Sequence, residues 1–260
     1  MMEKKTSARL KLQAKQALKG NYGICAGSFL IMVAVVFLIC FAAEIPLIFG
    51  LAFSGMSESA QGAVISIISI SIFVVLMQVI CFLLFSGYTR LCYRVCIGEE
   101  AQIRDLFFAF SRHIGKFIGL AFIFMLIPIV IGVPMGILRA ATVITARSAA
   151  FFGILSVAMG FLEMLLMLFV SLNYGMSIYI LVEDEEKNLI DALKESCRIM
   201  KGNKRRLFWL WLTFIGMIIL AYCSCGIGFV WVMPYMMCTN LFFYFDITGI
   251  REMKKSEEIW

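Results

Sequence analysis

The feature that most constrains this chain is a module that recurs three times along 260 residues, about 90 residues apart. Each copy joins a short basic amphipathic segment to two long apolar runs. Lys19-Gly20-Asn21 precedes the first apolar run, and Lys201-Gly202-Asn203 stands at the same place in the third copy. The middle copy has a degenerate version, Ser111-Arg112-His113. A fixed period of this kind indicates a supersecondary unit whose apolar face is covered by its neighbours.

The apolar runs predict an all-α integral membrane protein with six transmembrane helices. With 62% hydrophobic and 15% charged residues, the composition excludes a soluble domain. A helix needs about 20 apolar residues to cross a hydrocarbon core about 30 Å thick. The fifth run is shorter than this, but it carries two tryptophans suited to the membrane–water interface. The six runs are Ile24–Ala43, Ala63–Phe85, Phe117–Leu138, Ala149–Leu172, Leu207–Tyr222 and Ile227–Phe245.

These runs divide a single polytopic membrane domain, residues 1–260, into three repeats. The repeats fall at about 1–98, 99–182 and 183–260, and each combines one amphipathic helix with two spans.

The basic residues predict which ends of the spans face the cytoplasm. Of the 23 Lys and Arg residues, 21 lie before the first span, between alternate spans or at the C-terminus. By the positive-inside rule, both termini are cytoplasmic and the loops 44–62, 139–148 and 223–226 face outward. The expected location is therefore the cell (cytoplasmic) membrane, crossed several times. The net charge of +6 predicts contact with anionic lipids of the inner leaflet, and not with nucleic acid.

The segment from Thr6 to Lys19 has the period of an amphipathic helix. Leu10, Ala14 and Leu18 share one stripe, and Gly20 or Asn21 can adopt the left-handed conformation that ends the helix. Such a helix lies in the headgroup plane or packs on the cytoplasmic face of the protein itself, and the sequence permits both. A membrane-protein partner or a second copy of the chain is a further expected partner.

Glu163 is the one acidic side chain deep in an apolar run, and it shares a stripe with small residues. An ionisable group at this depth is a candidate functional residue. The alternative is a structural, protonated carboxyl that is hydrogen-bonded to Gln78, Asn240 or a hydroxyl group. Both interpretations stay open at this point.

Helix breakers give a second set of candidates, because broken helices line the binding sites of many transporters. The alternative is a set of kinked helices that only pack together. The candidates are Pro128, Pro134, Gly226, Gly228 and Pro234. The spacings Gly23-x-x-x-Gly27 and Gly132-x-x-x-Gly136 also predict close helix approach.

The sequence lacks the motifs of the common catalytic and metal sites. Its one histidine, His113, lies at the expected cytoplasmic edge, so no Ser/His/Asp or Cys/His set is available. The sequence also has no HExxH motif and no phosphate-binding GxxxxGK[ST] loop. The acidic run Glu183–Glu186 is typical of a solvated loop. We therefore expect no enzyme activity, no bound metal and no cofactor.

Several short motifs resemble a family of bacterial integral membrane proteins catalogued as a domain of unknown function. They are Ala17-Leu18-Lys19-Gly20-Asn21, Met200-Lys201-Gly202-Asn203, Phe214-Ile215-Gly216, Gly226-Ile227-Gly228 and Pro234-Tyr235. Tyr22 and Met217 stand where that family's pattern has tryptophan. More distantly, the chain resembles the membrane portion of some glycerophosphodiester phosphodiesterases, without their catalytic barrel. The resemblance implies a six-span bacterial membrane protein with no established activity.

The sequence thus favours a non-enzymatic membrane protein whose basic amphipathic helices engage the inner leaflet or a partner. The alternative is a small permease or lipid-handling protein with a pathway between repeats near Glu163. A membrane enzyme is a third and weaker reading.

Overall fold

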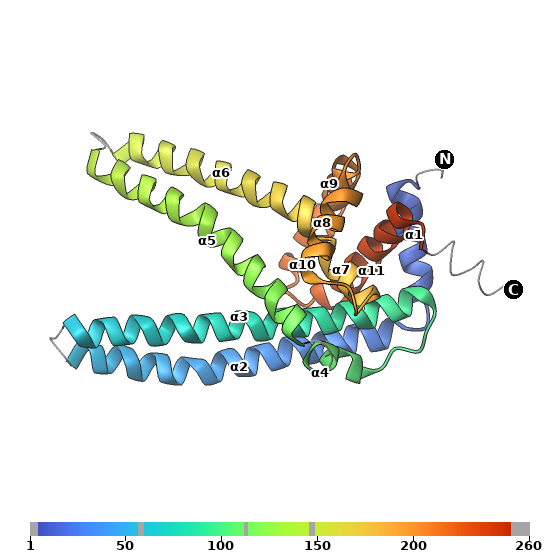
Figure 1. The fold of residues 1–260 in the computed structure, drawn as a ribbon, viewed down its shortest axis with the longest axis horizontal. Coiled ribbons are helices and arrows are strands. Elements are labelled where there is room, and N and C mark those ends of the chain that lie inside the picture. The colour runs from blue at the N-terminus through green and yellow to red at the C-terminus, as the bar shows by residue number, and fades with distance from the viewer. Residues whose placement is uncertain (1–4, 57–59, 112–113, 146–148, 251–260) are drawn as a thin grey trace, which may run out of the picture.

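The computed structural model describes residues 5–56, 60–111, 114–145 and 149–250, and its regular elements over these ranges are all helices (Figure 1). The expected all-α class is confirmed for this part of the chain. The helices are α1 Ser7–Leu18, α2 Tyr22–Met56, α3 Ala60–Ile97, the 3-10 helix η1 Ile103–Phe107, α4 Phe108–Ser111, α5 Ile114–Thr145, α6 Ala149–Tyr174, α7 Ser177–Glu183, α8 Leu189–Met200, α9 Lys204–Leu212, α10 Ile215–Cys223 and α11 Phe229–Thr248.

Two long helical hairpins, α2–α3 and α5–α6, extend in the same general direction and diverge away from α1 and α11 (Figure 1). Five helical stretches in the described part of the chain are long and apolar enough to cross a membrane. They are Tyr22–Ala42, Ser71–Ile97, Ile114–Ala140, Phe151–Glu183 and Lys204–Cys223. The sixth expected run forms α11, which is not one of these five. Its interior carries Pro234, Thr239 and Asn240, which lower its apolar character.

The loops expected to face outward are shorter than the sequence suggested. Helix α2 continues to Met56 and α3 begins at Ala60, so most of 44–62 is helical. Likewise α5 continues to Thr145 and α6 begins at Ala149. Most residues of these two extensions are apolar, so they can continue the helices past the ends of the expected spans.

The core lies where the bases of the hairpins meet α1, α7, α8 and α11. Helix α11 buries ten side chains, from Val232 to Phe245, and contacts α1, α2 and α3. The parts of the hairpins far from this core are much more exposed than the core itself. Their side chains include Val130, Ile154 and Val157, which are 67–74% exposed. Large apolar side chains exposed to this degree along helices of spanning length suit contact with lipid.

Helix α1 packs on the protein itself. Its stripe of Leu10, Ala14 and Leu18 is fully buried, mainly against α11. Of the two contacts expected for this helix, which do not exclude each other, the structure therefore shows the one with the protein itself. The backbone N–H of Lys5 donates to Asp246 Oδ1 at 3.3 Å, so the first and last described segments lie at the same end of the molecule.

The proline candidates do not break their helices. Pro128 and Pro134 lie inside the continuous α5, and Pro234 lies inside α11. The glycine candidates Gly226 and Gly228 lie between α10 and α11. A further interruption, at Thr213 and Phe214 between α9 and α10, has no proline or glycine to indicate it. Lys11 Nζ donates to the Thr213 carbonyl at 3.0 Å, and so satisfies a group that the break releases.

Candidate functional site

An ion pair joins α5 to α6 within the expected membrane region. Arg139 Nη2 lies 2.9 Å from Glu163 Oε2, with side chains 37% and 29% exposed. Helical side chains lean toward the N-terminus of their own helix, so in an antiparallel hairpin these two lean toward each other. The sequence analysis placed Arg139 in an outer loop, whereas the structure places it inside α5, which continues to Thr145. Of the two interpretations of Glu163, the structural one named Gln78, Asn240 or a hydroxyl group as its partner, and the partner in the structure is Arg139.

Two glycines make room for this ion pair. A Cβ added at Gly132 would lie 3.5 Å from Glu163 Oε1, and one at Gly160 would lie 3.4 Å from Arg139 Nη2. Larger side chains at these positions would displace the charged groups. The Gly-x-x-x-Gly spacings predicted close helix contact at other glycines as well. An added Cβ at Gly23, Gly27 or Gly136 has no atom within 4 Å. The predicted close helix approach is therefore absent at these three glycines, and at Gly132 the distance is that of an ordinary van der Waals contact.

The other two polar candidates lie elsewhere. Asn240 Oδ1 on α11 accepts a hydrogen bond from Trp211 Nε1 on α9 at 3.2 Å. Gln78 on α3 is exposed and faces a groove formed with α2 and α5. The structure therefore separates Glu163, Gln78 and Asn240 into three places and does not assemble them into one site.

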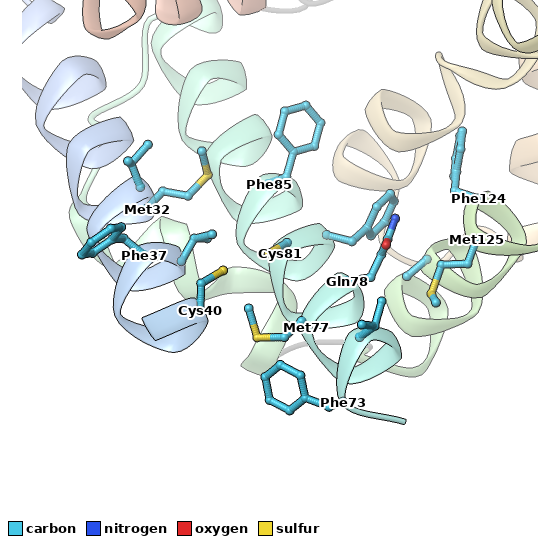
Figure 2. Close-up of a pocket in the computed structure, with 15 residues that line it drawn as sticks. Met32, Phe37, Cys40, Phe73, Met77, Gln78, Cys81, Phe85, Phe124 and Met125 are labelled. Carbon is cyan, nitrogen blue, oxygen red and sulfur yellow. The ribbon is translucent and has the colours of Figure 1, made fainter. Parts of the chain in front are cut away.

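The groove beside Gln78 has a volume of about 980 Å³. It lies between the first hairpin and the start of α5, and Figure 2 shows side chains from all three helices around it. Gln78 supplies its one amide group; the other lining residues are aliphatic, aromatic or sulfur-containing. The methionines and phenylalanines among them are Met32, Met77, Met125, Phe37, Phe73, Phe82, Phe85 and Phe124.

Sequence reasoning did not find this groove. Its lining comes from three separate apolar runs, and an apolar residue that faces a groove looks the same in a sequence as one that faces lipid. Phe82 and Phe124 stack at a centroid distance of 5.8 Å and join α3 to α5. Apolar grooves of several hundred cubic ångströms with one polar group are typical of sites for small hydrophobic ligands.

The two Lys-Gly-Asn motifs form the same turn. Lys19 has φ −65° and ψ 114°, Gly20 has φ +94°, and Asn21 N–H donates to Leu18 O at 3.0 Å. Lys201 and Gly202 repeat these angles, with φ −60°, ψ 119° and then φ +80°. These values define a type II turn, which favours glycine at its third residue. The turns join α1 to α2 and α8 to α9. The middle copy cannot be compared, because Arg112 and His113 lie outside the described residues.

Carboxylates of the acidic run and of η1 are paired with arginines of α3. Arg90 Nη2 lies 3.2 Å from Glu185 Oε1, and Arg94 Nη1 lies 2.9 Å from Asp105 Oδ2. These ion pairs attach the loop before α8 and the helix η1 to the first hairpin. Within the described ranges no group of three or more His, Cys, Asp or Glu side chains is arranged to hold a metal ion.

Five helices long and apolar enough to cross a membrane, with exposed apolar surfaces, are the features of a helical membrane protein in the described part of the chain. The chain belongs to the family described as "Protein of unknown function (DUF975)", whose model matches residues 1–251. No curated protein and no solved structure matches the chain. The more distant resemblance to glycerophosphodiester phosphodiesterases is not supported by these comparisons.

Proposed function

We propose that this protein is a non-enzymatic, lipid-binding protein of the bacterial cytoplasmic membrane that holds a lipid acyl chain in the groove between α2, α3 and α5. The groove is the observation that carries this proposal. We thereby assign the lipid-handling role expected near Glu163 to a different place, because Glu163 is paired with Arg139 and does not line the groove.

The position of the groove determines what can enter it. Its lining residues lie inside the candidate spans Tyr22–Ala42, Ser71–Ile97 and Ile114–Ala140. In a bilayer these segments are surrounded by acyl chains. Methionine side chains adapt to flexible apolar ligands, and the amide of Gln78 provides a donor for an ester oxygen.

We further propose six crossings and both termini in the cytoplasm, with α11 as the sixth crossing. The repeats would be α1–α3, η1–α6 and α8–α11. In support, the three buried positions of α1 correspond, 182 residues later, to the three buried positions of α8, which are Ala192, Ser196 and Met200. Both helices also end in the same turn. The inner leaflet is the proposed lipid partner of the exposed basic residues around these helices.

Photo-crosslinking tests the groove directly. The full-length protein, reconstituted with a phospholipid that carries a diazirine on its acyl chain, should be labelled mainly at residues of α2, α3 and α5 that line the groove. Val36→Trp fills the groove and should lower this labelling several-fold. Leu38→Trp is the matched control, because Leu38 lies on the same helix and is exposed away from the groove lining. Equal labelling of both variants would overturn the proposal.

A further inference from the structure

A second pocket, with a volume of about 450 Å³, lies between the start of α1 and the start of α9. Lys5, Ser7, Arg205, Arg206 and Trp209 are among its lining residues. It therefore brings together the basic N-terminal segment and the basic residues that follow the second Lys-Gly-Asn turn, about 200 residues apart in the sequence.

The pocket has more positive charge than its described neighbours neutralise. The carboxylate of Asp246 pairs with one of the lining residues, since its Oδ2 lies 2.6 Å from Arg206 Nη2. The same Nη2 also donates to the Lys5 carbonyl at 2.8 Å, which fixes the wall of the pocket. Among the described residues, the charged ends of Lys5 and Arg205 have no carboxylate partner, and the buried Arg206 Nη1 has no hydrogen-bond partner.

The start of α1 adds further donors. Thr6 is the N-cap residue, yet its side chain makes no capping bond. The first backbone N–H groups of a helix have no partner within the helix, and the helix dipole makes this end positive. An anion in the pocket would be close to these groups as well as to the basic side chains.

The pocket also lies beside the first residues of a candidate membrane span. Helix α9 begins the candidate span Lys204–Cys223, so Arg205 and Arg206 stand at its boundary. Trp209, one turn further along, is 56% exposed, and tryptophan is favoured at the membrane–water interface. We infer that this pocket binds the phosphate of an anionic phospholipid headgroup. The inference does not depend on the acyl-chain groove, which is formed by other helices.

Native mass spectrometry of the full-length protein in neutral detergent tests this inference. The protein is titrated with phosphatidylglycerol or with phosphatidylcholine of the same acyl chains, and then with phosphatidylglycerol in the presence of inorganic phosphate. The variant Lys5→Gln/Arg205→Gln removes two charges from the pocket without removing a contact described above, since Lys5 uses its backbone there. Arg104→Gln removes one exposed charge outside the pocket and outside α1 and α8, and is the matched control.

We expect the wild type to prefer phosphatidylglycerol at least tenfold, and the pocket variant to lose about 10- to 30-fold in affinity for it. The control should stay within about twofold of the wild type on the same scale. The single variant Arg205→Gln alters one exposed side chain and should lose part of the affinity for phosphatidylglycerol. It keeps the test possible if the double variant unfolds. Equal losses in pocket and control variants, competition by inorganic phosphate at equal concentration, or no lipid preference in the wild type would each overturn the inference.

Discussion

The ion pair between Arg139 and Glu163 should stabilise the α5–α6 hairpin measurably. At 2.9 Å between nitrogen and oxygen, the charge centres lie about 4 Å apart, where two unit charges interact by about 1 kcal/mol in water and about 4 kcal/mol at an effective dielectric constant of 20. Side chains that are 37% and 29% exposed lie between these limits. We therefore expect a coupling energy of about 1–4 kcal/mol.

The measurement is a double-mutant cycle on reversible unfolding in mixed micelles, using Glu163→Gln, Arg139→Gln and the two combined. Each single variant leaves one charge without its partner. The two single losses of unfolding free energy should therefore add up to more than the loss in the combined variant. Gly132→Leu should mimic the single variants by displacing Glu163, while Gly136→Leu should do so much less, since an added Cβ there meets open space. Free energies that add to within about 0.5 kcal/mol would refute the reasoning.

Three further predictions concern backbone positions and topology. Gly87→Ala should prevent stable folding, because its Cβ would lie 1.8 Å from the Leu106 carbonyl oxygen, whereas Gly115→Ala meets nothing within 4 Å and should be tolerated; detergent-stability assays of both variants check this. Gly20→Ala and Gly202→Ala should each cost about 1–2 kcal/mol of unfolding free energy because both have positive φ, with Gly23→Ala as the control; similar stability of all three would contradict the turn assignment. Reporter fusions at both termini should read cytoplasmic, and fusions near residues 57 and 143 external; an external signal from either terminus would exclude the proposed topology.

The local features of this protein follow from its sequence. Spans such as Ile114–Ala140 are predictable because lipid contact requires a long apolar helix whatever its neighbours are. The Lys-Gly-Asn turns are predictable because few residues other than glycine adopt a φ near +90° without strain. The buried stripe of α1 is likewise visible in the spacing of Leu10, Ala14 and Leu18.

Tertiary structure decided the features that depend on which helices meet. Glu163 has Arg139 as its partner because α5 continues beyond the expected end of its span, and hydropathy does not set that end. The stripe of α1 is covered by α11 and does not face lipid, although both environments are apolar and favour the same residues. The groove beside Gln78 and the basic pocket at Lys5 each combine distant segments, and a distance between such segments is a property of packing that no local pattern encodes.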